Sequence, residues 1–369
     1  MNVQLNETQQ MLKASAREFL SEICPPKKVR EMRAMPAGFS PELWKEMGSL
    51  GWLGLAFPES AGGSAMPFLD LCLLIEELGH ACVPSPFLES IAGAGLLLAE
   101  AGGTGREELL TAVAAGGKLV VPAFHGIADD EGRRVLPSMQ RDGNDYVIDG
   151  THLFVPYGGY ATHFVCLATV AGQPDDPMLF LIPASSPGVT VIRLRSMRDE
   201  RPSRLELAGV TLAADALLAS GEEVTKLVRR ALNRMDAARC FDIVGALSWV
   251  LEDTVSYAKD RKQFGQPIGS FQVLQHYCAD MHVMLEGLKM AALHTGWRLS
   301  EGLEADREVA VVCAYAHSVV PRFLALAHQI HGAMGVTIEH DLHLYSTRAF
   351  APGHSLAPLS EYLEAALTV

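Results

Sequence analysis

The pattern of hydrophobic and polar positions divides the chain into three blocks. From about residue 7 to 117, apolar residues recur every three or four positions, which is typical of amphipathic helices; examples are Leu71, Leu74, Ile75 and Leu78. Between about 119 and 217 the apolar residues are often β-branched or aromatic and occur in short runs, separated by turn residues such as Asp149-Gly150. From residue 222 onward the helical period returns and predicts helices over 222–260, 271–301 and 304–333, with a shorter one over 340–350.

The middle block predicts a small sheet. Its expected strands are the apolar runs 119–124, 146–148, 163–170, 178–182 and 189–192. A helical block, a β block and a second helical block in this order are typical of an α+β fold, with a small sheet between helical layers. We therefore expect three domains: an N-terminal all-α domain at 1–118, a central β domain at 119–217 and a C-terminal helical bundle at 218–369.

Composition narrows the class of protein. The chain of 369 residues is 49% apolar and carries a formal net charge of −13, so we expect a packed globular protein. This charge disfavours nucleic acid or an anionic membrane as a partner, because both attract basic surfaces. Seven scattered cysteines without a Cys-x-x-Cys pair are typical of reduced thiols in a cytoplasmic protein. The first residues show no signal-peptide pattern, and apolar stretches such as 243–251 are too short for membrane insertion.

The connector between the helices at 222–260 and 271–301 carries the most informative residues. The stretch Arg261–Gln272 contains the helix breakers Gly265, Pro267 and Gly269, which predict a tight turn. It also holds an arginine among glutamines and phenylalanines, which a plain turn does not require. An arginine beside free backbone N–H groups suits a phosphate or pyrophosphate. The alternative is a surface turn whose arginine caps the preceding helix.

Four motifs in order resemble the acyl-CoA dehydrogenase family, and the resemblance covers nearly the whole chain. They are the N-terminal pattern from Leu50-Gly-Trp-Leu-Gly-Leu55 to Glu76-Glu77-Leu78-Gly79, the strand Tyr146–Pro156, the connector Arg261–Gln272 and the helix end Gln329–Gly335. The resemblance implies an N-terminal helical domain, a central small β domain and a C-terminal four-helix bundle. It also implies an FAD enzyme that oxidises an acyl-CoA thioester to the 2-enoyl thioester, with an electron-transfer flavoprotein as acceptor. Family members assemble as dimers or tetramers that share the flavin across an interface.

The same resemblance assigns cofactor contacts to three segments. In the connector, Arg261 would meet the pyrophosphate and Gln263 would bind nearby, while the other predicted contacts are Phe264, Ile268, Phe271 and Gln272. At the last long helix, the predicted contacts are Gln329, Gly332 and Ala333; the alternative is a helix stop with Gly332 in a left-handed conformation. In the central domain, Phe154 and Pro156 would lie against the flavin ring.

Several positions depart from the family pattern. The Thr-Glu-Pro and Gly-Ser-Asp motifs of many relatives are absent from Pro122–Gly126 and onward, and Ala333 replaces a glycine. Pro156 stands where relatives offer a backbone N–H to the flavin, which proline lacks. Such departures resemble members that work as mixed two-subunit assemblies, often on steroid or branched side chains. The chain could therefore be a non-catalytic or half-site subunit of a heterotetramer, or a flavin-free acyl-CoA binding protein.

The reaction requires a carboxylate that takes the proton α to the thioester. The Tyr-Glu-Gly-Thr setting of many relatives is absent from 350–358, and two acids lie on the helix before the connector, Asp236 and Asp242. Asp236 is expected in a solvated ion pair with Arg239. Asp242 shares an apolar stripe with Met235, Ala238, Ala246 and Trp249, where a lone acid is costly unless it is partnered or functional. We predict Asp242 as the base; a structural aspartate paired with a distant arginine or histidine is the alternative.

Other polar groups predict no further chemistry. Four histidines near one helix end (His328, His331, His340 and His343) lack a zinc-enzyme spacing, so we expect polar helix-end residues and no metal. Glu76 and Glu77 are expected on a solvated face. No Rossmann glycine motif and no P-loop is present, which disfavours a nicotinamide enzyme or a kinase.

Overall fold

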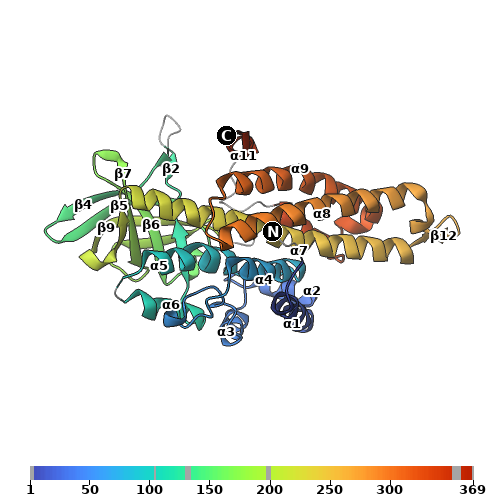
Figure 1. Ribbon diagram of the computed structural model, residues 1–369, viewed down its shortest axis with the longest axis horizontal. Coiled ribbons are helices and arrows are strands. Elements are labelled where there is room, and N and C mark those ends of the chain that lie inside the picture. The colour runs from blue at the N-terminus through green and yellow to red at the C-terminus, as the bar shows by residue number, and fades with distance from the viewer. Residues whose placement is uncertain (1–3, 104, 129–133, 197–200, 351–358, 368–369) are drawn as a thin grey trace. The chain divides into compact units, whose positions relative to one another are not determined.

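The computed structural model describes residues 4–103, 105–128, 134–196, 201–350 and 359–367 (Figure 1). The chain forms two compact units that interleave along the sequence. Unit 1 comprises residues 1–31, 67–83 and 236–369, and unit 2 comprises residues 32–66 and 84–235. The predicted α+β fold class is confirmed, because a sheet from the middle of the chain is flanked in sequence by helical regions. The domain boundaries at 118 and 217 stay a prediction.

Unit 1 is helical. Its elements are α1 (Glu7–Ile23), the start of α2 (Pro26–Ala34), α4 (Phe68–His80), most of α7 (Glu222–Asp260), α8 (Gln272–Ser300), α9 (Asp306–His331), α10 (Leu342–Phe350) and α11 (Leu359–Leu367). The C-terminal helices predicted at 222–260, 271–301, 304–333 and 340–350 are thus confirmed to within two residues. Figure 1 shows α8 and α9 lying side by side.

Two glycines let α4 and α7 approach closely within unit 1. A Cβ atom on Gly79 would lie 2.2 Å from the backbone oxygen of Asp242, and one on Gly245 would lie 1.9 Å from that of Glu76. Only glycine fits at such backbone contacts. This close crossing fixes the position of Asp242 relative to the end of α4.

Glu76 and Glu77 are buried, which corrects the expected solvated face. They are 5% and 1% exposed, and α1 covers them with two cations. Lys13 Nζ lies 2.8 Å from Glu76 and 2.9 Å from Glu77, and Arg17 Nε donates to Glu77 over 2.6 Å. Burial of a carboxylate is tolerated when it is paired in this way.

The helix α9 is long and apolar enough to cross a membrane by length and composition alone. Its apolar side chains, among them Val312, Cys313, Phe323 and Leu324, are buried inside unit 1. That burial is typical of a core helix in a globular unit.

Unit 2 contains an eight-stranded sheet. The strand order is β10-β7-β6-β4-β5-β9-β8, and β1 pairs with β6. The strands are β1 (Val120–Ala123), β4 (Ser138–Asp142), β5 (Asp145–Val155), β6 (His163–Val170), β7 (Gln173–Pro183), β8 (Val189–Arg193), β9 (Ser203–Leu212) and β10 (Leu217–Ser220). A separate two-stranded pair joins β2 (Ile127–Ala128) to β3 (Arg134–Val135). All five expected strands are present.

Helices and tight turns complete unit 2. They are α3 (Pro41–Ser49), the π-helix η2 (Leu88–Gly95), α5 (Leu96–Ala101), α6 (Arg106–Ala114) and the 3₁₀ turns η1 (Glu59–Ala61), η3 (Gly158–Tyr160) and η4 (Ala214–Ala216). The sheet core is filled by fully buried side chains such as Phe164, Phe180 and Leu205. The first turns of α7, up to Met235, also belong to this unit.

Candidate functional site

The connector after α7 is a β-hairpin. β11 (Lys262–Gln263) pairs with β12 (Gln266–Pro267), which leaves Phe264 and Gly265 as a two-residue loop. Both loop residues have positive φ, +55° and +80°, as a type I′ turn requires. The 3₁₀ turn η5 (Ile268–Ser270) then leads into α8. The predicted tight turn is therefore confirmed, and Figure 1 places it, at the label β12, where α7 meets α8.

Arg261 is exposed at the base of this hairpin. Its backbone N–H donates to Tyr257 O over 2.8 Å and so closes the helix, and its carbonyl accepts from Ile268 N over 2.8 Å. Within the described part of the chain its guanidinium has no hydrogen-bond or ion-pair partner, so the side chain does not cap α7 as the alternative required. An unpaired guanidinium beside exposed backbone suits an anion supplied from outside this chain.

Phe264 is 92% exposed at the tip of the hairpin. Its ring meets the edge of the Phe271 ring, with the two centroids 6.0 Å apart. A bulky residue at positive φ has a strained backbone, and an apolar ring exposed to water is unfavourable in free energy. Both costs are offset where another surface covers the ring.

The second predicted segment ends α9. Gln329, Gly332 and Ala333 are exposed, and Gly332 has φ +60° and ψ −140°. This backbone region is open almost only to glycine, yet it is not the left-handed helical conformation of the helix-stop alternative. The 3₁₀ turn η6 (Gly332–Val336) follows and leaves the backbone of Ala333 accessible.

Tyr257 and His331 join the two segments. Their rings stack with centroids 4.4 Å apart, and Tyr257 Oη donates to His331 O over 3.4 Å. Because Tyr257 also accepts from Arg261 N and His331 precedes Gly332, the structure ties the hairpin to the end of α9. No sequence pattern pointed to Tyr257, which lies one turn before Arg261 on the α7 face that meets His331 of α9.

Asp253, His331 and His340 form a cluster whose ligand atoms lie within 4.8 Å of one another. Hydrogen bonds assign a proton to each Nε2. His340 Nδ1 accepts from Leu342 N, and His331 Nε2 faces Thr254 Oγ1 at 3.2 Å, whose own proton goes to Val250 O. Asp253 Oδ2 lies 3.6 Å from His331 Nε2 and 3.7 Å from His340 Nε2, too far for a hydrogen bond to either. A metal needs an unprotonated nitrogen there, so the hydrogen bonds of the two imidazoles to Thr254 and Leu342 disfavour a cation site.

His331 is not the polar helix-end residue that the sequence predicted. It is buried, and burial, with His340 and His328 nearby, lowers its pKa to about 4. Burial also raises the pKa of Asp253 above its usual range. The other two histidines behave as expected: His328 bonds Ser346 and His343 bonds the carbonyl of His340.

Asp242, the predicted base, is 2% exposed and lies in an ion pair. Arg348, from α10, places Nε 3.0 and 3.1 Å from the two carboxylate oxygens and Nη2 2.6 Å from Oδ1. Arg239 Nη1 lies 3.7 Å from Oδ2. This is the geometry of the structural alternative, in which a distant arginine partners the acid. The role of Asp242 as base stays a prediction, since a proton arriving there would displace a guanidinium bond.

Asp236 is buried rather than solvated, which corrects its expected state. Its Oδ2 accepts from Tyr362 Oη, on α11, over 2.7 Å. Arg239, the partner expected for Asp236, also lies near Asp242, with its Nη1 3.7 Å from Oδ2 of that residue. Residues 351–358, which lack the Tyr-Glu-Gly-Thr setting, lie outside the described residues.

The third predicted segment lies in unit 2. Phe154 has a positive φ of +56° and is 47% exposed, whereas Pro156 is buried. Only the side chain of Phe154 is thus accessible to a ring placed against this strand. The altered Pro122–Gly126 stretch contacts it from within the unit, because His125 O accepts from Leu153 N over 2.9 Å and faces His152 Nδ1 at 3.2 Å.

The accessible groups fit FAD chemically. An unpaired guanidinium suits a pyrophosphate, the glutamine amides of Gln263, Gln272 and Gln329 suit ribose and base edges, and Phe264 offers a face for an adenine ring. Ile268 and Phe271 are half-buried beneath them. Each of these donors faces outward from unit 1, as sharing with another chain would require.

Sequence comparison identifies the family. A model described as the acyl-CoA dehydrogenase N-terminal domain matches residues 6–117, and one described as the C-terminal domain matches residues 225–351. Acyl-CoA dehydrogenase FadE27 of Mycobacterium tuberculosis is 28% identical over 355 residues, covering 94% of this chain and 92% of that protein. Acyl-CoA dehydrogenase IpdE2 of Mycolicibacterium smegmatis is 28% identical and 97% of each chain is covered.

Structural comparison agrees. A crystal structure of the ChsE4–ChsE5 complex from Mycobacterium tuberculosis superposes with a TM-score of 0.88 at 27% identity, covering 99% of this chain and 97% of that one. A Tcur3481–Tcur3483 steroid ACAD variant gives a TM-score of 0.86 at 26% identity, with coverage of 98% and 96%. The chain belongs to the acyl-CoA dehydrogenase family of FAD-dependent oxidoreductases.

Proposed function

We propose that this chain is one subunit of a mixed two-subunit acyl-CoA dehydrogenase, and that its partner supplies the catalytic base. The observation that carries this assignment is the ion pair of Asp242, whose two carboxylate oxygens are both held by Arg348. A base must have a free oxygen within reach of the substrate proton. Support also comes from the similar ChsE4–ChsE5 structure, which is a complex of two different chains.

In this assembly the chain binds and orients the cofactor. Arg261 pairs with the pyrophosphate, Phe264 and Phe271 wall the adenosine, and Gln263, Ile268 and Gln272 border it. Gln329, Gly332 and Ala333, at the end of α9, would contact the same cofactor. Phe154, beside Pro156 in unit 2, would contact a flavin ring. FAD held by these residues would supply the hydride acceptor for oxidation of an acyl-CoA to the 2-enoyl-CoA. An electron-transfer flavoprotein then takes the electrons, and the acyl group is a steroid or branched side chain.

The visible absorbance of flavin tests this assignment. Chain purified alone should be colourless, and chain co-expressed with a second family member encoded nearby should be yellow and should bleach when acyl-CoA is added. A yellow chain that bleaches on its own, as a homo-dimer or homo-tetramer, would contradict the two-subunit assignment. A chain that stays colourless with every partner yet binds acyl-CoA would instead be a flavin-free acyl-CoA binding protein.

The same assay decides whether Asp242 is the base. We expect Asp242→Asn in the assembly to retain flavin and to bleach at a rate within about threefold of the wild type, because the base lies on the partner. Loss of bleaching with full flavin content would assign the base to Asp242. The flavin content of each preparation is the control for misfolding.

A further inference from the structure

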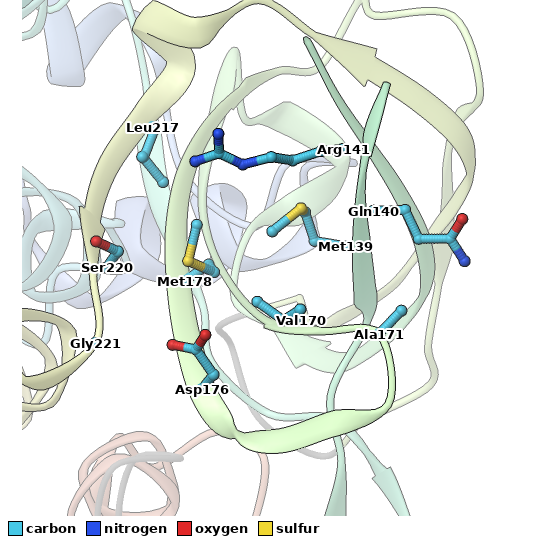
Figure 2. A pocket seen from close by; sticks show the side chains of 10 residues that line it. All are labelled: Met139, Gln140, Arg141, Val170, Ala171, Asp176, Met178, Leu217, Ser220 and Gly221. Atoms are coloured by element: carbon cyan, nitrogen blue, oxygen red, sulfur yellow. The ribbon is translucent and has the colours of Figure 1, made fainter. Parts of the chain in front are cut away.

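A cavity of about 660 Å³ opens in the sheet of unit 2 (Figure 2). Figure 2 shows strands curving around it, with Met139 and Met178 between Arg141 at one end and Asp176 at the other. The cavity is also lined by Val170 and Ser220. None of these residues belongs to the predicted cofactor segments, and a space of this size holds a small organic molecule.

The floor of the cavity is apolar and adaptable. Met139 is opposite Val170 in the β4–β6 pairing, and Met178 is opposite Ser220 in the β7–β10 pairing. Both methionine side chains are buried. Thioether side chains adjust to the shape of an apolar ligand without losing contact.

Arg141 is oriented by aromatic stacking. Its guanidinium carbon lies 5.4 Å from the centre of the Tyr146 ring, and that ring packs edge-on against the buried Phe180 at 5.2 Å. Cation–π stacking holds the guanidinium in place but leaves its N–H groups unused. Arg141 is exposed, and among the residues that the structure describes none accepts a hydrogen bond from its guanidinium.

Asp176 is half-buried at the other end of the cavity and likewise has no hydrogen-bond or ion-pair partner in the described chain. Opposite charges that share a cavity normally pair when their side chains can meet. Here the methionines separate them, so each charge remains available to a ligand. A ligand with one charge would satisfy one end and leave the other unsatisfied.

We propose that this cavity binds a small zwitterion with an apolar body, such as an ω-amino acid. Its carboxylate lies on Arg141, its ammonium group lies on Asp176, and its alkyl chain lies over Met139 and Met178. A nucleotide or CoA phosphate fits less well, because its negative charge would face the carboxylate of Asp176. The site is independent of the cofactor segments, so its failure would leave the proposed function untouched.

Calorimetric titration of the full chain, with FAD and partner as purified, tests the proposal. The probes are 4-aminobutanoate, 6-aminohexanoate and 8-aminooctanoate, compared with hexanoate and hexylamine, which each keep one charge. We expect one ω-amino acid to bind at least about tenfold more tightly than either single-charge analogue, since each end gains a charge-assisted bond. No binding of any ω-amino acid at about 10 mM, or displacement of the bound one by equimolar CoA, would overturn the proposal.

Two variants assign the ends. Arg141→Gln should weaken the preferred ω-amino acid by about tenfold or more, and Asp176→Asn should abolish its preference over hexanoate while keeping hexanoate affinity. Gln173→Ala is the matched control, because Gln173 is an exposed residue of β7 near Asp176 and is not among the residues that line the cavity. Flavin content checks folding in each case. Equal affinities in all three variants would place the ligand elsewhere and refute the site.

Discussion

At the scale of single residues, the ion pair of Asp242 and Arg348 joins α7 to α10. A lone acid on the apolar stripe of α7 had to be partnered or functional, and spacing alone left both interpretations open. The partner, Arg348, lies 106 positions away and reaches Asp242 because α10 packs beside α7. Helical periodicity relates residues within a turn or two, so no pattern in the sequence could identify this pair.

The Asp242–Arg348 pair should be strongly coupled. Arg348→Met leaves a buried carboxylate without its main partner, and we expect the free energy of unfolding to fall by about 3–5 kcal/mol. The double variant Asp242→Leu/Arg348→Met should recover most of this loss, because neither charge then remains buried. Denaturant titration measures both. The exposed pair Arg322–Asp280 is the control, and Arg322→Met should cost less than about 1 kcal/mol. Additive losses in the double variant would contradict the coupling.

At the scale of elements, the sequence predicted helices better than strands and turns. Long amphipathic helices such as α7 and α9 are predicted by the 3.6-residue period of their apolar residues. The strand β9 was not predicted, although it carries four buried apolar residues: Leu205, Leu207, Val210 and Leu212. Gly209 interrupts the alternation of apolar and polar residues along β9, so the strand pattern is not recognisable in the sequence. The hairpin at Phe264 was expected only as a tight turn, because phenylalanine is not a residue that signals positive φ.

The backbone strain at Phe264 can be measured separately from the proposed contact of its ring with the flavin cofactor. We expect Phe264→Asn to raise the free energy of unfolding of the isolated chain by about 0.5–1 kcal/mol, because asparagine tolerates positive φ. The same change should lower the flavin content of the assembly, since the exposed ring is lost. Phe264→Ala removes the ring without easing the backbone, so it should lower flavin content and gain no stability. Thermal unfolding and flavin absorbance give the two readings; an Asn variant that keeps full flavin content would refute the contact.

At the scale of the whole molecule, the order of helical, β and helical blocks was predictable from the periodicity and composition of the sequence. The family was predictable from its motifs. The grouping into two interleaved units was not, because it depends on which distant segments pack together. One such contact pairs Glu76 and Glu77 with Lys13 and Arg17. No local sequence pattern relates these residues, so the two acids were expected in solvent.

Stability should fall in mild acid. Burial lowers the pKa of His152, in unit 2, and of His331, in unit 1, from 6.5 to about 4. The unfolded chain therefore binds more protons between these values, and each histidine should cost about 1.4 kcal/mol per pH unit as the pH falls from 6.5 toward 4. Above 6.5 the effect vanishes. Urea unfolding of His152→Gln should show a shallower pH dependence than wild type, whereas the exposed control His276→Gln should not; equal slopes for wild type and His152→Gln would refute this.

The interleaving of the two units has a consequence for biosynthesis. A ribosome makes the chain from its amino end, so every segment of unit 2 has been synthesised once residue 235 is added. Residues 1–31 and 67–83, although made first, must wait for residues 236–369 before unit 1 can close. During that interval α4 can pack against α1, which pairs with its two acids, but it lacks α8 and the later part of α7. Unit 2 can therefore fold before unit 1 is complete, although the first helices of unit 1 are made early.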